Sequence, residues 1–223
     1  MPRQRIIAAI DIGSSKTSTV IASMGEEEKI HVIGASSVSS KGINRGQIVN
    51  IDQATETVIE SVEAAERMAG YNLTRVLISV SGPHIGSQNS HGVVAVAEPE
   101  GEISQDDVLR VIDAAKAISL PSSREVIHVL PRFFIVDGQE GINDPVGMSG
   151  TRLEVETHII SGASSAMRNL AKCVSEIGAD VQSLVFSGIA SAESVLTETE
   201  KDLGVVLVDI GGGVTKVSVF VEG

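Results

Sequence analysis

The sequence predicts an α/β fold organised around two β-hairpins that share an acidic, glycine-containing turn. The first hairpin lies in RIIAAIDIGSSKT (5–17) and the second in GVVLVDIGGGVT (204–215). In each, an aliphatic run ends in Asp-Ile-Gly, and apolar alternation resumes after the turn. Hydrophobic residues make up 42% of the chain but aromatic residues only 2%, so we expect an aliphatic core between a mixed sheet and helices.

The two turns have the chemistry of phosphate-binding loops. A short aliphatic run bounded by glycine is typical of a strand buried on both faces, whose end is rigid. Asp11 and Asp209 end such runs, and the glycines after them let backbone amides approach an anion without a Cβ in the way. We expect the two turns to face each other. Two facing carboxylates favour a hard divalent cation, so the pair predicts Mg²⁺ with a nucleotide polyphosphate.

Each turn also has a simpler interpretation. A single Asp-Ile-Gly is most simply an ordinary hairpin with a capping Asp, but two copies at opposite ends of one chain favour a shared function. Lys16-Thr17 resembles the end of a Walker P-loop, yet the Gly-x4-Gly-Lys spacing is absent and no helix is expected to follow. We therefore reject the P-loop interpretation.

Composition excludes several classes of protein. Acidic residues outnumber basic ones 29 to 17, for a net charge of −12, which excludes an unspecific nucleic-acid-binding surface. No apolar run reaches membrane length and the N-terminal run is too short for a secretory signal, so the chain is expected to be cytoplasmic. The single cysteine, Cys173, lies at helical spacing among apolar residues and is expected to be a small core residue.

Between the hairpins, strand and helix patterns alternate. A third strand is expected at 30–35, followed by a loop at 36–46. Asp52 is the expected N-cap of a helix that ends at Gly70 and whose apolar face comprises Ala54, Val58, Val62, Ala65 and Ala69. A buried strand follows at 75–81. Further on, a helix from Ser164 to a stop at Gly178, a strand at 181–186 and a helix opened by Ser187-Gly188 lead to the second hairpin.

The middle of the chain, residues 83–160, is predicted to be an inserted subdomain. Strands are expected at 91–97, 125–130 and 132–136, with glycine and proline at the joints to the outer chain. Ser104 and Asp107 predict a capping-box-like start to one helix, whose apolar positions are Val108, Val111, Ile112, Ala115 and Ile118.

This order of elements resembles the actin, Hsp70 and sugar-kinase superfamily. Within it, four runs are similar to the FtsA family of bacterial cell-division proteins: AIDIGSSK (9–16), GINRGQIVNI (42–51), VSGPHI (80–85) and PVGMSGTRLE (145–154). The resemblance covers essentially the whole chain, and the last run is its most specific part.

The resemblance implies an actin-like (ribonuclease H-like) first lobe with an inserted α+β subdomain of the FtsA 1C (SHS2) type. Residues 1–82 and 161–203 would form the first lobe (1A), residues 83–160 the insertion, and residues 204–223 the first hairpin of the second lobe (2A). Family members continue with the rest of that lobe, so we expect the chain to end inside a longer protein. The apolar face of the second hairpin, at Val217, Val219 and Val221, would then lie uncovered and be prone to aggregation.

The resemblance also implies a nucleotide site. ATP phosphates would lie against Gly13, Ser14, Ser15, Lys16, Thr17, Gly211, Gly212, Gly213 and Thr215, with Mg²⁺ held through water by Asp11 and Asp209. Weak nucleotide binding is expected of this chain by itself. In related ATPases an acid or amide near the start of the helix after the last first-lobe strand positions the attacking water. Phe186-Ser187-Gly188 supplies neither Gln nor Glu, so at most a weak ATPase is expected, and no catalytic residue is assigned.

By the same resemblance the protein would be a filament-forming scaffold of the septum, on the cytoplasmic face of the membrane at the division site. It would bind FtsZ through second-lobe parts beyond this chain, later divisome proteins through residues 83–160, copies of itself, and the membrane through a C-terminal helix also beyond this chain. No nucleic acid is expected as a partner. Two alternatives remain open: a small-molecule kinase of the same superfamily, for which Asn44 and Arg45 but no acid follow the first hairpin, and a pilus-assembly or chaperone-like scaffold.

Overall fold

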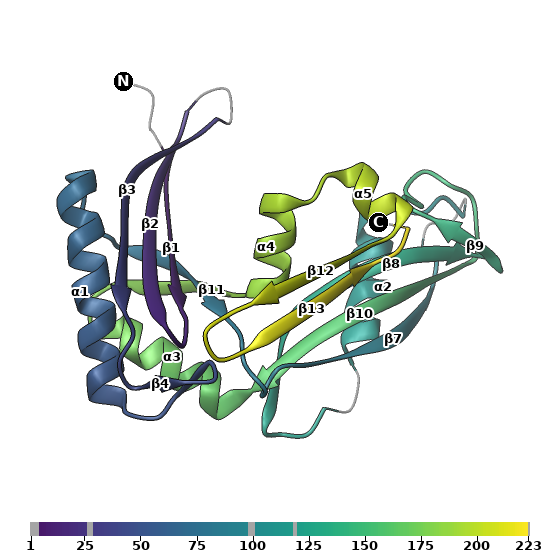
Figure 1. Ribbon diagram of the computed structural model, residues 1–223. Coiled ribbons are helices and arrows are strands. Elements are labelled where there is room, and N and C mark those ends of the chain that lie inside the picture. The colour runs from purple at the N-terminus through teal and green to yellow at the C-terminus, as the bar shows by residue number, and fades with distance from the viewer. Residues whose placement is uncertain (1–4, 26–28, 98–100, 118–119, 223) are drawn as a thin grey trace. The chain divides into compact units, whose positions relative to one another are not determined.

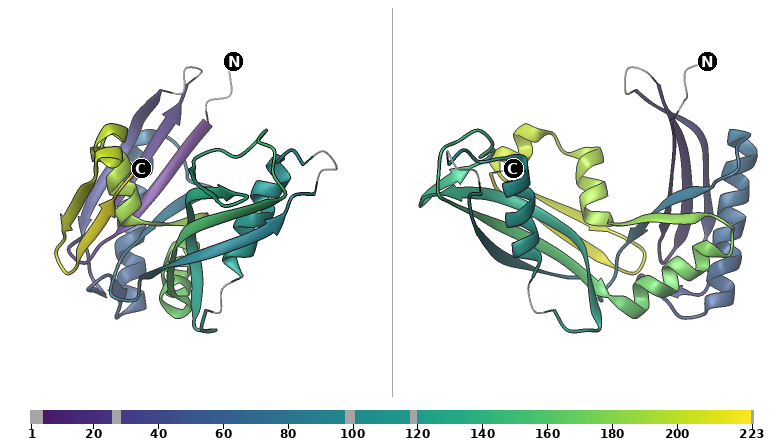
Figure 2. Two further views of the ribbon diagram at one scale, coloured as in Figure 1. Left: turned by 90° about the vertical axis from the view of Figure 1, so that its right-hand side faces the viewer. Right: turned by 180° about the vertical axis from the view of Figure 1, so that it is seen from behind.

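The computed structural model describes residues 5–25, 29–97, 101–117 and 120–222, and the chain divides into two compact units (Figures 1 and 2). Unit 1 comprises the described residues up to His84 and those from Ala163 onward, and unit 2 comprises Ile85–Gly162. Each unit contains a β-sheet and at least one helix. The α/β class expected from the sequence is therefore confirmed.

Unit 1 is built on a five-stranded sheet in the order β11-β6-β1-β2-β3. Its strands are β1 (Arg5–Ile12), β2 (Lys16–Met24), β3 (Ile30–Ser39), β6 (Arg75–Val80) and β11 (Asp180–Phe186). The first three pair antiparallel, whereas β6 runs parallel to both β1 and β11. The mixed sheet and the first hairpin are thus as expected.

Two helices, α1 (Ile51–Ala69) and α3 (Ser164–Ser175), pack on this sheet and on each other. Figure 1 shows α1 and α4 (Ser187–Val195) on opposite sides of it. The prediction that β1 is buried on both faces is wrong: Ala8 and Ile10 are buried, but Ala9 and Asp11 between and after them are exposed. The reason is that α1 and α3 cover the face that carries Ile10, and the opposite face of β1 is left open.

The start of α1 differs from expectation by two residues. Asn50, not Asp52, is the N-cap, because its side chain accepts a hydrogen bond from the Gln53 amide at 3.1 Å. Asp52 lies in the first turn, where a carboxylate favours the helix dipole. Gly70 ends the helix in the left-handed conformation, as expected. The expected loop at 36–46 is partly strand: β3 continues to Ser39, and β4 (Ile43–Asn44) pairs with β5 (Gln47–Ile48).

The second hairpin, β12 (Val205–Ile210) and β13 (Thr215–Phe220), forms a two-stranded sheet. One face packs against α4 and carries half-buried side chains, while the other face is exposed. The exposed face comprises Val206, Val208, Ile210, Val217 and Val219, each more than half exposed. Val221, which follows β13, is 58% exposed, so the expected exposure of this apolar face is confirmed. The prediction that the strand before the second turn, β12, is buried on both faces is wrong. The short helix α5 (Glu198–Leu203) was not predicted from the sequence.

The described residues of unit 2 form a four-stranded sheet in the order β7-β10-β8-β9 and a helix, α2 (Gln105–Lys116). The strands are β7 (Gly86–Ala95), β8 (Arg124–Val136), β9 (Gln139–Ile142) and β10 (Arg152–Ala163). Its hydrophobic core, aliphatic apart from one phenylalanine, is formed by Ile103, Val108, Val111, Ala115, Phe134, Val136, Ile142, Leu153 and Val155. Ile118, expected on the apolar face of this helix, lies outside the described residues.

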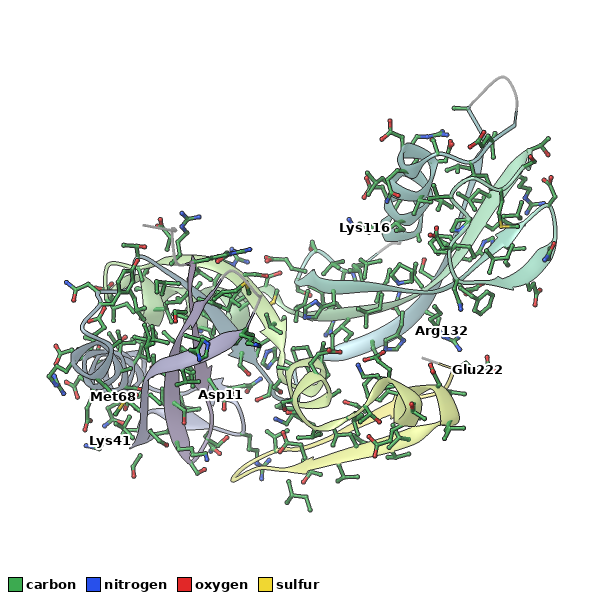
Figure 3. The ribbon with its side chains drawn as sticks, turned by 90° about the horizontal axis from the view of Figure 1, so that it is seen from above. Asp11, Lys41, Met68, Lys116, Arg132 and Glu222 are labelled. Atoms are coloured by element: carbon green, nitrogen blue, oxygen red, sulfur yellow. The ribbon has the colours of Figure 1, made fainter. Side chains whose placement is uncertain are left out.

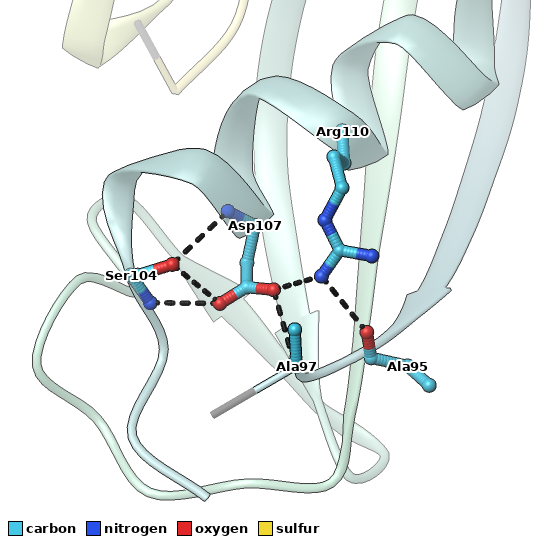
Figure 4. A network of polar contacts seen from close by, with 5 residues as sticks. All are labelled: Ala95, Ala97, Ser104, Asp107 and Arg110. Carbon is cyan, nitrogen blue, oxygen red and sulfur yellow. Dashed lines mark hydrogen bonds and ion pairs between the residues drawn. The ribbon is translucent and has the colours of Figure 1, made fainter. Parts of the chain in front are cut away.

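The capping box of α2 is present as expected (Figure 4). Ser104 donates its hydroxyl to Asp107 at 2.7 Å and accepts from the Asp107 amide at 3.3 Å. Asp107 also accepts from the Ala97 amide at 3.2 Å and from Arg110, whose guanidinium donates to the Ala95 carbonyl. The Ser104 hydrogen bonds, more than any other contact, lower the pKa of the buried Asp107 carboxyl from 3.8 to about 2. This network fixes the end of β7 against the start of α2.

The strands of unit 2 depart from expectation at one proline. The strands expected at 125–130 and 132–136 are one continuous strand, β8, which runs through Pro131. β9 pairs with β8 at Phe134 and Val136, so this side of β8 does not require an amide donor at Pro131. β7 begins five residues earlier than the strand expected at 91–97, because it pairs with β10 from Gly86 onward. β9 and β10 were not predicted.

Candidate functional site

The first acidic turn is closed by a backbone hydrogen bond. Ile12 pairs with Thr17, and the Gly13 amide donates to the Lys16 carbonyl at 3.0 Å. A Cβ added at Gly13 would lie 2.8 Å from that carbonyl oxygen, so the turn requires glycine there. Asp11 is exposed on the open face of the sheet, away from α1, the helix that carries Met68 (Figure 3).

The second turn repeats this geometry. Ile210 pairs with Thr215, and the Gly211 amide donates to the Val214 carbonyl at the same 3.0 Å. A Cβ added at Gly211 would lie 3.0 Å from the carbonyl oxygen of Val214. Both turns therefore place four residues between an isoleucine and the threonine that pairs with it, and the acid lies one residue before the isoleucine. The sequence repeat is a repeat in structure.

The tips of the two turns meet within unit 1. A Cβ added at Gly212 would lie 2.6 Å from Ser15 Cβ, and one at Gly213 would lie 2.7 Å from Ser14 Oγ. The structure thus brings the two predicted phosphate loops together. The backbone amides of Ser14, Ser15, Gly212 and Gly213 donate to no hydrogen-bond acceptor in the described part of the chain. These amides are the donors that an anion between the turns would use.

A third segment, which was not predicted, joins the two tips. The Gly46 amide donates to Ser14 Oγ at 2.8 Å, and Arg45 Cα would lie 3.3 Å from a Cβ at Gly213. Both residues adopt positive φ, at +50° for Arg45 and +70° for Gly46, in the tight turn between β4 and β5. The Asn-Arg-Gly sequence at 44–46 was a turn signal that pointed to this loop but not to its contact with the hairpins.

The two carboxylates have different surroundings. Asp11 is paired in register with Ser18, whose hydroxyl donates to Ser37 Oγ at 3.1 Å. Asp209 is paired in register with Lys216, and Lys216 Nζ lies 2.6 Å from Asp209 Oδ2. Ser191 of α4 also donates to Asp209 Oδ2, at 3.4 Å. Lys216 and Ser191 are therefore residues of the site that were missed from the sequence.

The other side chains predicted to contact phosphate differ in their exposure to solvent. Lys16 and Thr215 are exposed near the tips. The Thr17 side chain is fully buried, and its hydroxyl shares a hydrogen bond of 2.9 Å with Ser40 Oγ. Phosphate contacts by Lys16, Thr17 and Thr215 stay predictions.

The start of α4 lies beside the second hairpin. A Cβ at Gly188 would lie 2.7 Å from Ser218 Oγ of β13. Ser187 is 5% exposed, and its hydroxyl finds no hydrogen-bond partner among the described residues. Ser191, one helical turn further on, reaches Asp209. This face of α4 therefore presents hydroxyl groups, not a carboxylate or amide, to the second hairpin.

Two other chemistries receive no support from the structure. Cys173 is fully buried, and burial raises the pKa of its thiol, so it is a core residue as expected and not an accessible nucleophile. The described residues contain no group of three or more His, Cys, Asp or Glu side chains placed to hold a metal ion directly. A separate finding concerns membranes: no helix in the described part of the chain is both long enough and apolar enough to span one.

Comparison with solved structures establishes the class of fold. The chain is similar to a chain of the PilM-PilN type IV pilus biogenesis complex, with a TM-score of 0.67 and 14% identity over 96% of this chain and 57% of that one. It is also similar to the ethanolamine utilization protein EutJ from Carboxydothermus hydrogenoformans, with a TM-score of 0.52 and 13% identity over 100% of this chain and 50% of that one. These likenesses concern the fold alone, and they show that the chain has a partial actin-like fold.

Sequence comparison then gives the family relation. Residues 82–161 match the family described as the SHS2 domain inserted in FTSA. The chain is 39% identical to the cell division protein FtsA of Pseudomonas aeruginosa over 98% of this chain and 52% of that protein. It is 37% identical to FtsA of Bacillus subtilis over 100% of this chain and 50% of that protein. It is 34% identical to FtsA of Escherichia coli K12 over 99% of this chain and 52% of that protein. The chain is similar to the N-terminal part of FtsA, so the resemblance predicted from the sequence is confirmed, and it spans about half the length of these curated relatives.

Proposed function

We propose that this chain is the phosphate-binding part of an ATP-dependent, actin-like bacterial cell-division protein. The observation that carries the proposal is the meeting, at their tips, of two turns with the same length and closing hydrogen bond, each with backbone amides that donate to no acceptor among the described residues. Such a pair can hold successive phosphates of one nucleotide. FtsA homology over nearly the whole chain supports the role in cell division.

The fit of the residues to Mg·ATP differs between the two turns. The glycines and free amides suit phosphate oxygens at both turns. The exposed Asp11 carboxylate suits a hydrated divalent cation, which prefers carboxylate and water oxygens. Asp209 is already neutralised by Lys216, so it fits such a cation less well than Asp11 does. Mg²⁺, when bound with ATP, would supply countercharge to the phosphates near Asp11.

The wider role follows the homology. We assign residues 1–82 and 161–203 to the first lobe, 83–160 to the inserted subdomain and 204–223 to the start of the second lobe. Self-association, recruitment of later division proteins through residues 83–160, and FtsZ and membrane attachment through parts beyond this chain belong to the same proposal. So does location on the cytoplasmic face of the membrane. The hydroxyl-bearing start of α4 is consistent with weak hydrolysis at most.

Calorimetric titration with Mg·ATP tests the nucleotide proposal. Gly13→Val and Gly211→Val each place side-chain atoms against the carbonyl that closes its turn, and each should lower affinity about tenfold or more. Gly25→Val is the matched control, because a Cβ at Gly25 meets nothing within 4 Å. Circular dichroism would check that each variant is folded. Wild-type affinity in both folded turn variants would contradict the proposal.

A further inference from the structure

The register of the two hairpins places different residues opposite the two acids. Ser18 lies opposite Asp11, whereas Lys216 lies opposite Asp209. The lysine does not extend into solvent, since its ammonium lies 2.6 Å from the carboxylate and its side chain is 16% exposed. The first turn therefore presents a carboxylate without an ion-pair partner among the described residues, and the second presents a neutral pair.

The ion pair is held on the covered face of the hairpin. Asp209, Lys216 and Ser218 alternate with the exposed valines, on the side that packs against α4. Ser191 of α4 donates to the same carboxylate oxygen that contacts Lys216. Partial removal from water strengthens the attraction between the two charges compared with an exposed pair. Lys216 is therefore fixed one residue from the end of the turn.

We propose that Lys216 is a phosphate-binding residue, which supplies at the second turn the positive charge that a divalent cation would otherwise supply at Asp209. This inference rests on the proposed nucleotide function and names a residue that determines its metal dependence. An ammonium group has three donors, so Lys216 can keep its contact with Asp209 and donate to a phosphate oxygen as well. Divalent cation is then needed chiefly on the Asp11 side.

Inorganic tripolyphosphate is the suitable probe, because the residues of the site contact phosphates and not the nucleoside. Its affinity would be measured by calorimetry for the 223-residue chain, once with Mg²⁺ and once with EDTA. We expect Lys216→Ser, which copies the residue opposite Asp11, to lower affinity in EDTA about tenfold or more, as loss of a charge-assisted hydrogen bond does. With Mg²⁺ the loss should be several times smaller, because the cation can then occupy the place beside Asp209.

Two further variants make the result specific. Lys116→Ser removes the same charge from an exposed site on α2 and should leave both affinities unchanged. Lys216→Arg keeps the charge and should retain most of the affinity in EDTA. Lys216→Gln keeps most of the side-chain length and serves as the neutral variant if thermal unfolding shows that the serine variant does not fold.

The outcomes separate this inference from the proposed function. If wild type binds tripolyphosphate and Lys216→Ser shows the wild-type ratio of affinities with and without Mg²⁺, Lys216 is a cross-strand ion pair only and the inference is overturned. If wild type binds neither tripolyphosphate nor ATP in either condition, the proposed function itself fails. A loss in EDTA that Mg²⁺ restores supports both.

Discussion

The hairpin of β1 and β2 lies within a five-stranded sheet, whereas the hairpin of β12 and β13 is a two-stranded sheet. Ile10 and Ile21 of the first hairpin are fully buried. At the position equivalent to Ile10, one residue before the acid, the second hairpin has Val208, which is 51% exposed. The same turn is thus built in one case on a packed strand pair and in the other on a pair covered on one face.

The comparison shows that turn geometry and burial have separate origins. Loop length, the glycine after the isoleucine and the closing hydrogen bond are local, and they are the same in both hairpins. Burial depends on neighbours: β6, β3 and α1 surround the first hairpin, while α4 packs on the second. A ribbon of two strands has little stability of its own. The first hairpin therefore holds its turn more rigidly than the second.

The largest difference should appear on truncation of the equivalent side chains. Ile10→Ala leaves a cavity in the core of unit 1 and should lower the free energy of unfolding by about 2–5 kcal/mol. Val208→Ala removes a half-exposed side chain and should change it by about 0.5 kcal/mol or less. Denaturant unfolding of both variants beside wild type gives the two values. Equal losses would show that the second hairpin is as well packed as the first.

The turns and helix ends could be predicted from the sequence, because they depend on residues that are neighbours in the chain. The two turns, the helix stop at Gly70 and the capping box at Ser104 depend on neighbouring residues and were found. One-sided burial of β1 could not be found, because an aliphatic run does not tell how many helices cover a sheet. The ion pair of Lys216 with Asp209 was missed for a related reason: it depends on strand register, which the turn length fixes but the motif does not display.

A cap in unit 2 offers a reference outside both hairpins. Ser104→Ala removes the N-cap of α2 and should cost about 1 kcal/mol at neutral pH. The pKa of Asp107 is lower in the folded state, so its stabilising contribution is complete above 3.8 and is lost as pH falls toward about 2. The difference between wild type and variant should therefore shrink over that range. Unfolding monitored from pH 7 to pH 2 measures it, and a difference independent of pH would contradict this assignment.

The smallest effect on stability is expected on the exposed face of the second hairpin. Val219→Thr keeps a β-branched side chain and should change the free energy of unfolding by about 0.5 kcal/mol or less. It should still slow aggregation, because it interrupts the exposed row of valines. Light scattering at rising protein concentration would measure this, with Ser18→Thr in the first hairpin as a control. Unchanged aggregation would show that this face is not the aggregating surface.

Hydrogen exchange of the turn amides with and without Mg²⁺ and tripolyphosphate tests most directly whether the two turns act as one site. The backbone amides to follow are those of Ser14, Ser15, Gly212 and Gly213, because none of them donates a hydrogen bond to an acceptor among the described residues. If the two turns form one site, exchange should slow at both turns over the same range of tripolyphosphate concentration. Protection of one turn while the other exchanges as before, in a chain that binds tripolyphosphate, would contradict a single site shared by both turns.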